Sequence, residues 1–285
     1  MAGAGKIDRP RVMTDDELKA IKFDNPREAV KAIREGKHEV VLLRKDEQTM
    51  KEIDDALYKD KDLLFSLWNR VALEEYQAPE VTVDMIKNPA KKENKKKWKR
   101  FSHVPGIASG FINLYNSYTH DLFLQDKNIV ELCDILYGRR WQIRPNRWRI
   151  SYKENKSKLD KIMSGHLEGT SVGRSTCLKD GEISFIIPIS KGRSFIFWEG
   201  TAKQCTTDEK YADQVRSYYE KNNNGNNFVS INGKEPFLFH ENGRTRRRQL
   251  VLNEEEYIIL FSESVAHEVD TSTISSSIFI SPFDP

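Results

Sequence analysis

The sequence contains no long apolar run and few cysteines. None of its hydrophobic stretches approaches the roughly 20 residues that a helix needs to cross a bilayer, and we identify no secretory leader, so we expect no membrane partner. Cys133, Cys177 and Cys205 are widely spaced and form no CxxC pair. An odd number of dispersed cysteines favours reduced thiols and a cytoplasmic location.

The sequence also lacks a large excess of either charge. The 46 Lys and Arg residues nearly balance the 43 Asp and Glu residues, and a net charge of +3 does not indicate a nucleic-acid partner by itself. Basic residues nevertheless cluster in three segments, 91–100, 139–149 and 243–249, of which the first two contain Trp98, Trp141 and Trp148. Cations beside aromatic rings suit single-stranded nucleic acid, and a basic surface could also recruit an acidic or nucleotide-containing substrate. Solvated loops around a buried tryptophan are the simpler interpretation.

The first half of the chain has helical patterns. Thr14 with Glu17 is a capping box, and Asn25 followed by Pro26 is an N-cap and first-turn pair. Further helical spacing covers 46–76 and 127–138, and a short apolar run at 39–44 predicts a strand. Pro89 and the lysine run that follows it predict a basic loop near 88–100. We therefore expect residues 1–140 to be a mainly helical support region.

The second half, 141–285, has strand patterns instead. Short segments rich in Ile, Phe, Val and Tyr are separated by Gly, Asn, Asp or Lys-Gly turns, and one helix with an Asn-rich loop interrupts them at 208–227. The expected strands are 147–152, 182–190, 193–200, 227–231, 236–241, 248–254, 256–262 and 272–283. About eight such strands predict an α+β protein with a jelly-roll core on which the N-terminal helical region packs.

One short stretch in the second half has the residue types of a metal site. In an extended segment His166 and Glu168, two residues apart, point to the same face. His267 follows an apolar strand and could supply a third ligand; His240, which also ends an apolar strand, is the alternative. Two imidazoles and one carboxylate form the facial triad that leaves positions open on non-haem Fe(II). Polar residues at strand ends are the competing interpretation.

The order of these segments resembles the Fe(II)- and 2-oxoglutarate-dependent dioxygenases, nearest the phytanoyl-CoA dioxygenase type. "HLEG" comes first, "ISFIIPISKGRSFIFWEG" follows, and "YIILFSESVAHEV" precedes a final strand "SSSIFISPF". The carboxylate is more often Asp in that family, and the clavaminate synthase type uses Glu. The resemblance, over roughly 147–285, implies a double-stranded β-helix of the cupin-like kind. It also implies Fe(II) held by His166, Glu168 and His267, with 2-oxoglutarate and oxygen as co-substrates for hydroxylating an unidentified substrate.

The sequence departs from this family at the anchor for the far carboxylate of 2-oxoglutarate. An Arg or Lys commonly follows the distal histidine by about ten residues, but no Lys or Arg follows Arg248 here, and Ser275 to Ser277 occupy that region. Jumonji-type members supply the basic residue from an earlier strand. Arg193 is then the best candidate, because alternation places it on the face of Phe195 and Phe197. The other candidates are Lys191, with Ser276 as a hydroxyl supplement, and more weakly Arg149 and Arg247.

Two other functions are open at this point. The missing C-terminal anchor is compatible with a jelly-roll binding module that has no turnover. The basic and aromatic clusters are compatible with a nucleic-acid-binding protein, and either property could be combined with an oxygenase.

Overall fold

The structure is a computed structural model of the 285-residue chain. It describes residues 10–48, 51, 55, 75, 77, 79–100, 111–115, 127–138, 142–143, 147–151, 183–210, 246–253, 255–269, 275–279 and 282–283. Among these residues it contains helices and strands in mixed order, as expected for a chain with both patterns. No helix in this part of the chain is long and apolar enough to span a bilayer.

The first two helices begin where the capping patterns predict. In α1 (Asp15–Ala20) the Thr14 hydroxyl accepts from the backbone N–H of Glu17, and the Glu17 carboxylate accepts from the backbone N–H of Thr14. In α2 (Pro26–Arg34) the Asn25 side chain accepts from two first-turn N–H groups. The chain leaves α2 through Gly36, whose φ of 67° belongs to the left-handed region.

The segment 88–100 was expected to be a loop, and this expectation is wrong for most of its length. Residues Lys92–Lys99 form helix α6, which follows α5 (Val83–Lys87). Trp98 of α6 is fully buried in the core, and the Asn94 amide donates to the backbone oxygens of Asp84 and Asn88. Lysine is a good helix former, so this tertiary anchoring is enough to order the segment.

Two more helices are described, α8 (Lys127–Tyr137) and α10 (Thr201–Thr207). The first confirms the predicted helix at 127–138, and Gly138 follows it with φ 72°. The second was not predicted. Most of the expected helical segment 46–76, most of the expected helix and loop at 208–227 and the expected strands 227–231 and 236–241 lie outside the described residues.

The described strands form two large sheets and one small one. A seven-stranded sheet has the order β2-β3-β10-β7-β12-β6-β4, a four-stranded sheet has the order β1-β9-β8-β11, and β5 pairs with β13. The strands are β1 (Arg11–Val12), β2 (Lys22–Phe23), β3 (Val40–Arg44), β4 (Phe111–Tyr115), β5 (Gln142–Ile143), β6 (Arg147–Ser151), β7 (Ile183–Pro188), β8 (Arg193–Glu199), β9 (Arg246–Leu252), β10 (Tyr257–Ser262), β11 (His267–Val269), β12 (Ser275–Phe279) and β13 (Pro282–Phe283).

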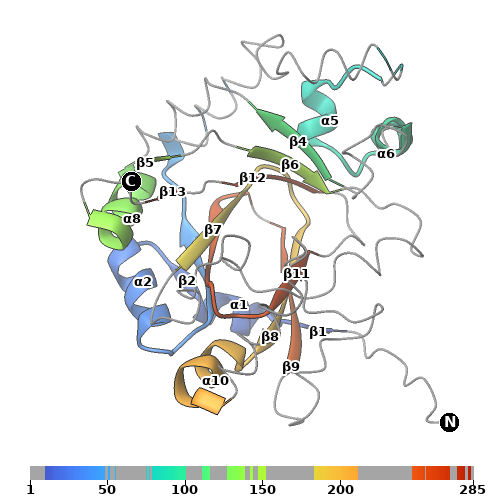
Figure 1. The fold of residues 1–285 in the computed structure, drawn as a ribbon. Coiled ribbons are helices and arrows are strands. Elements are labelled where there is room, and N and C mark those ends of the chain that lie inside the picture. Colours follow the sequence, from blue (N-terminus) through green and yellow to red (C-terminus); the bar gives the residue numbers. More distant parts are fainter. Residues whose placement is uncertain are drawn as a thin grey trace, which may run out of the picture.

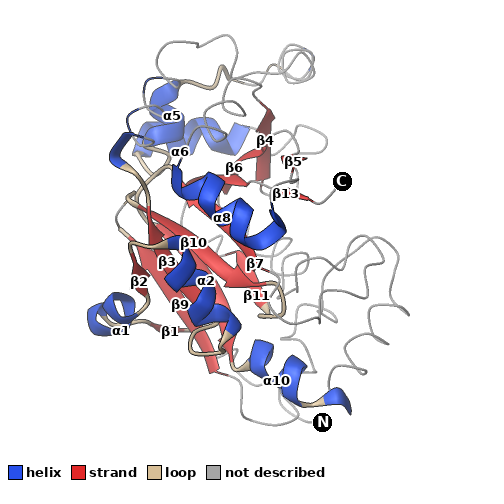
Figure 2. Cartoon of the chain, turned by 90° about the vertical axis from the view of Figure 1, so that its left-hand side faces the viewer, coloured by secondary structure: helices blue, strands red, loops and turns tan. Residues whose placement is uncertain are grey.

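Both faces of β3, β7 and β10 in the seven-stranded sheet are buried, which explains their continuous apolar runs. Val41 and Leu43 of β3 pack into a cluster shared with α2 and α8, whereas Val40 and Leu42 pack into a cluster shared with the four-stranded sheet. Figure 2 shows α2 and α8 across the outer face. In Figure 1, β7 and β12 lie across from β8 and β11. The interior between the sheets is the layer in which the predicted site residues should meet.

Three strand pairs are nested within one another along the chain. β8 pairs with β9, β7 pairs with β10 outside them, and β6 pairs with β12 outside both, all antiparallel. Strands from both halves share the larger sheet, since β2, β3 and β4 precede residue 140. The division into two regions near residue 140 remains a prediction.

Candidate functional site

His267 begins β11 and lies inside the protein between the two sheets. Its side chain is 2% exposed, and its register partner on β8 is Phe197. Its ring lies 5.2 Å from the Phe195 ring, nearly parallel to it, and 4.6 Å from the Phe261 ring (centroid distances). These two rings belong to facing sheets, so the imidazole is held between them in the apolar interior.

A backbone contact sets the tautomer of this imidazole. Nδ1 of His267 lies 3.1 Å from the carbonyl oxygen of Val265. A carbonyl oxygen can only accept, so a neutral ring bonded in this way carries its proton on Nδ1 and its lone pair on Nε2. This is the arrangement of metal-binding histidines, whose second nitrogen commonly donates to a carbonyl or carboxylate.

Arg193 begins β8 on the same inner face. It is 0% exposed, and alternation along β8 places it with Phe195 and Phe197, both members of the core between the sheets. Its register partner Leu252 belongs to the same core, which agrees with the predicted orientation. The neighbouring candidate Lys191 lies exposed in the turn, where Gly192 adopts φ 77° and donates its N–H to Leu252. Of the two cations, only Arg193 faces the interior.

The serine segment forms β12. Ser276 lies opposite Ile150 of β6, and its side chain is not described. Ser277 is buried, and its hydroxyl oxygen has no hydrogen-bond partner. Ser277 lies opposite Pro188 of β7, and Pro188 is on the same inner face of β7 as Ile186. The described serine that faces the interior is therefore Ser277, not the predicted Ser276.

Several predicted residues lie where the structure does not test them. His166, Glu168 and the alternative ligand His240 are outside the described residues, and Arg149 is described in β6 by its backbone alone. Within the described part of the chain no three His, Cys, Asp or Glu residues are grouped to hold a metal ion. The metal triad remains a prediction of which one member, His267, has a known position.

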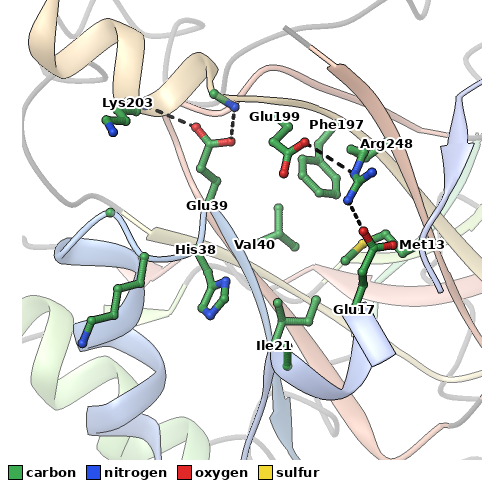
Figure 3. Close-up of a pocket in the computed structure, with 14 residues that line it drawn as sticks. Met13, Glu17, Ile21, His38, Glu39, Val40, Phe197, Glu199, Lys203 and Arg248 are labelled. Atoms are coloured by element: carbon green, nitrogen blue, oxygen red, sulfur yellow. Dashed lines mark hydrogen bonds and ion pairs between the residues drawn. The ribbon is translucent and has the colours of Figure 1, made fainter. Parts of the chain in front are cut away.

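Sequence reasoning missed a pocket of about 360 Å³ at the end of the interior where β8 ends (Figure 3). Its apolar wall consists of Met13, Ile21, Val40 and Phe197. Three carboxylates and three cations also line it, namely Glu17, Glu39, Glu199, Lys37, Lys203 and Arg248. This balance gives the pocket no preference for an acidic ligand over a basic one.

Glu39 closes one side of the pocket and caps α10. Its carboxylate accepts from the backbone N–H groups of Gly200, Ala202 and Lys203 at 2.7, 2.8 and 3.2 Å. Burial raises the pKa of Glu39, and the three backbone hydrogen bonds oppose that rise. No local pattern in the sequence indicates this cap, because Glu39 and α10 are about 160 residues apart.

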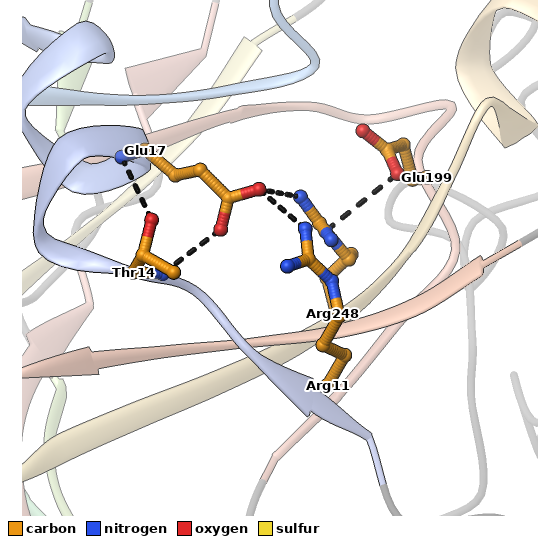
Figure 4. A network of polar contacts seen from close by, with 5 residues as sticks. All are labelled: Arg11, Thr14, Glu17, Glu199 and Arg248. Carbon is orange, nitrogen blue, oxygen red and sulfur yellow. Dashed lines mark hydrogen bonds and ion pairs between the residues drawn. The ribbon is translucent and has the colours of Figure 1, made fainter.

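A charged network forms the opposite side of the pocket (Figure 4). The Arg248 guanidinium lies 2.5 Å from Glu17 and 3.6 Å from Glu199, and Arg11 also pairs with Glu17. The backbone N–H of Thr14 and the Arg11 guanidinium lower the pKa of Glu17. Arg248 is only 6% exposed, so this part of the 243–249 cluster is not the solvated basic surface that the sequence suggested.

The pocket adjoins the position of His267. Arg248 is the register partner of Phe197, and Phe197 is the register partner of His267, so the three residues form one row across β9, β8 and β11. Directly opposite residues share a face of the sheet. Phe197, which lines the pocket, is therefore the neighbour of His267 on the same face of the sheet.

Comparisons with known proteins give remote structural likenesses. No family model matches the chain, and no curated protein sequence matches it significantly. An oxidoreductase of the 2OG-Fe(II) oxygenase family from Burkholderia pseudomallei has a TM-score of 0.45 and 14% identity, over 98% of this chain and 96% of that chain. An N-substituted L-amino acid dioxygenase from Burkholderia ambifaria has a TM-score of 0.38 and 13% identity, over 89% and 85%. The complex of that dioxygenase with alpha-KG has a TM-score of 0.38 and 11% identity, over 90% of this chain and 86% of that chain. Similarity at this level does not assign the chain to a family.

Proposed function

We propose that this protein is an Fe(II)- and 2-oxoglutarate-dependent oxygenase that hydroxylates a C–H bond of a small molecule. The residues proposed to bind iron are His166, Glu168 and His267. Arg193 is proposed to bind the far carboxylate of 2-oxoglutarate. The proposed core is a jelly roll of the double-stranded β-helix type.

The nested strand pairs are the observation that carries this proposal. Between the pairs β6–β12 and β7–β10, the outgoing chain covers residues 152–182 and the returning chain covers 263–274. In a jelly roll these two intervals would face each other as a further nested pair. His166 and Glu168 lie in the middle of the first interval, and β11 with His267 lies in the second. The nesting thus supports the approach of the three residues.

The chemistry of His267 fits the proposed metal. Its Nδ1–H bond to Val265 presents Nε2 as the ligand atom, and the Phe195 and Phe261 rings fix the plane of the imidazole. An open facial site on Fe(II) would supply oxygen activation coupled to the decarboxylation of 2-oxoglutarate to succinate. The contribution of the described residues is to orient one ligand and to exclude water with aromatic side chains.

The position of Arg193 fits the proposed anchor. It lies four residues before Phe197 on β8, about 13 Å from the row of His267 at the usual strand rise. Phe195 lies between the two positions on the same face of β8, so a five-carbon dicarboxylate that joins them would run alongside its ring. A guanidinium can bind a carboxylate through two parallel hydrogen bonds. Lys191 lies in the exposed turn, and Ser276 alternates with the inward Ser277, so neither is as well placed as Arg193.

The pocket beside Phe197 is the proposed substrate space. It lies in the row of His267, and its volume of about 360 Å³ is in the range of small-molecule sites. Its mixed lining of apolar and charged residues supports a ligand with an apolar body and polar ends. An acidic or nucleotide-containing substrate receives no support from this lining.

Metal binding by matched histidine variants tests the proposal. The protein is dialysed anaerobically against Fe(II) and the bound iron is measured, and iron-dependent succinate formation from 2-oxoglutarate is then followed. We expect one iron per chain and slow succinate formation, with both lost in His267→Ala. The bound iron should be retained in His38→Ala, whose histidine lines the pocket but is not a proposed ligand. Iron binding without 2-oxoglutarate turnover would favour a non-catalytic jelly-roll module, and equal loss in both variants would contradict the assigned ligand.

A further inference from the structure

A row of lysines covers the solvent side of α6. Asn94 and Trp98, four residues apart, bury one side of the helix, and the opposite side is exposed. Four lysines at the spacing i, i+3, i+4 and i+7 share that exposed side, which we call the lysine face: Lys92, Lys95, Lys96 and Lys99. At the rise of a helix they extend over about 10 Å.

Helix stability does not explain the lysine face. Lys92 with Lys96, and Lys95 with Lys99, are like charges four residues apart, which destabilise a helix. Among the described residues, no carboxylate lies within ion-pair distance of Lys92, Lys95 or Lys96, whereas Lys91 pairs with Asp84 at 2.7 Å. The face is a concentrated positive charge held by a fixed helix, on a protein whose overall charge is only +3.

The composition of α6 restricts the partner. Binders of single strands stack bases on aromatic side chains, but Trp98, the one aromatic residue of α6, is 0% exposed. The single-strand interpretation of this cluster is therefore wrong at Trp98. A helix that lies in a membrane interface inserts an apolar face, and the apolar side of α6 is already packed in the protein core. Contacts to the phosphates of a duplex need neither an exposed aromatic ring nor an exposed apolar face.

We propose that the lysine face of α6 binds the phosphate backbone of duplex nucleic acid, independently of its sequence. Figure 1 places α6 at the rim of the molecule, beside α5 and far from α10. The proposal does not depend on the oxygenase function, because α6 contributes no residue to the proposed site. A duplex held there would not cover the pocket beside Phe197.

The salt dependence of binding measures the number of phosphates contacted. The full-length protein is titrated into two fluorescently labelled duplexes of unrelated sequence, and anisotropy is followed between about 50 and 200 mM salt. Four contacts predict a weakening of about 150-fold over this range, and equal affinities for the two duplexes. Lys95→Glu with Lys96→Glu leaves two contacts, for which the weakening falls to about 12-fold.

Two further variants keep the test decisive. Lys19→Glu with Arg34→Glu makes the same change in charge at exposed cations of α1 and α2, and we expect it to bind like the unmodified protein. Glutamine at all four positions removes the charges but keeps good helix formers, and we expect it to abolish binding with an unchanged helix signal in circular dichroism. Equal weakening in the α1/α2 variant overturns the proposal. So does binding to phosphatidylserine vesicles without binding to either duplex, or no duplex binding at about 50 mM salt.

Discussion

Replacing Arg193 with methionine tests whether this residue binds the co-substrate or stabilises the fold. The guanidinium is 0% exposed on the inner face of β8, opposite Leu252 and in line with Phe195. Methionine has a similar length and no charge. If Arg193 serves the co-substrate and not the fold, we expect the free energy of unfolding to change by less than about 1 kcal/mol. Removing one partner of a structural buried ion pair would instead cost about 3–5 kcal/mol.

The expected loss in 2-oxoglutarate affinity is much larger. A bidentate contact consists of two charge-assisted hydrogen bonds, each contributing about 1.5 kcal/mol or more. Losing both costs about 3 kcal/mol, which is a factor of about 100 in the dissociation constant. Metal affinity should hardly change, because Arg193 is about 13 Å along the strand from the row of His267.

Calorimetric titration with 2-oxoglutarate on the metal-loaded protein, without oxygen, measures this loss, and urea unfolding measures stability. Lys191→Met is the matched control, since Lys191 is an exposed cation two residues away; its affinity should stay within about twofold of the unmodified protein. Unchanged 2-oxoglutarate affinity in Arg193→Met would refute the assignment. A large loss of stability would instead make Arg193 a structural residue of the core.

Three further predictions concern stability and can be measured by urea unfolding. Trp98→Ala empties a fully buried site and should destabilise the protein by about 3–5 kcal/mol, so a change below about 1 kcal/mol would contradict the anchoring of α6. Glu39→Gln places an amide NH₂ group, which cannot accept a hydrogen bond, against one of three backbone N–H groups. The free energy of unfolding should therefore fall by about 1–2 kcal/mol. Burial raises the pKa of Glu39 above its usual 4.5. The free energy of unfolding of the unmodified protein, relative to that of Glu39→Gln, should therefore fall as the pH rises above about 5, and a rise would contradict this assignment. Lys91 and Asn94 lower the pKa of Asp84 from 3.8 to about 2. The stability that Asp84 adds relative to the Asp84→Asn variant should therefore be present above pH 3.8 and be lost as the pH falls through 2.

Local signals in the sequence predicted local structure well. The Thr14 and Asn25 caps fixed the starts of α1 and α2, because the side chain and the N–H groups that it accepts are at most three residues apart. The apolar runs at β3, β7, β8 and β10 also became strands, and residues on both faces of each of these strands are buried. Alternation alone placed Arg193 on the inner face of β8.

Features that depend on distant contacts were not predictable in the same way. α10 is short and rich in Thr, and its first N–H groups are satisfied by Glu39, which directly precedes the distant β3. α6 follows a proline and carries repelling lysines, but Trp98 and Asn94 fix it to the core. Arg248 looked like part of an exposed basic cluster, whereas Glu17, brought close by the pairing of β1 with β9, neutralises it. In each case the deciding partner lies far away in the sequence.

The candidate site was predictable from sequence to a similar extent. The sequence favoured His267 over His240 because one final strand follows it, and His267 lies buried at the start of β11. The choice between the two histidines as iron ligand remains a prediction. Its bond to Val265 and the pocket beside Phe197 could not be inferred, because both depend on how the two sheets face each other. The approach of His166 and Glu168 to His267 remains a prediction.

Anaerobic titration of the protein with Fe(II) and then 2-oxoglutarate, followed by visible absorbance, tests the oxygenase proposal most directly. Chelation of iron by the keto acid produces a weak charge-transfer band. We expect this band to saturate at one equivalent in the unmodified protein, to be absent in His166→Ala and His267→Ala, and to require much more 2-oxoglutarate in Arg193→Met. A band of the same strength in His267→Ala, or no band in the unmodified protein at saturating iron and 2-oxoglutarate, would contradict the proposed iron site.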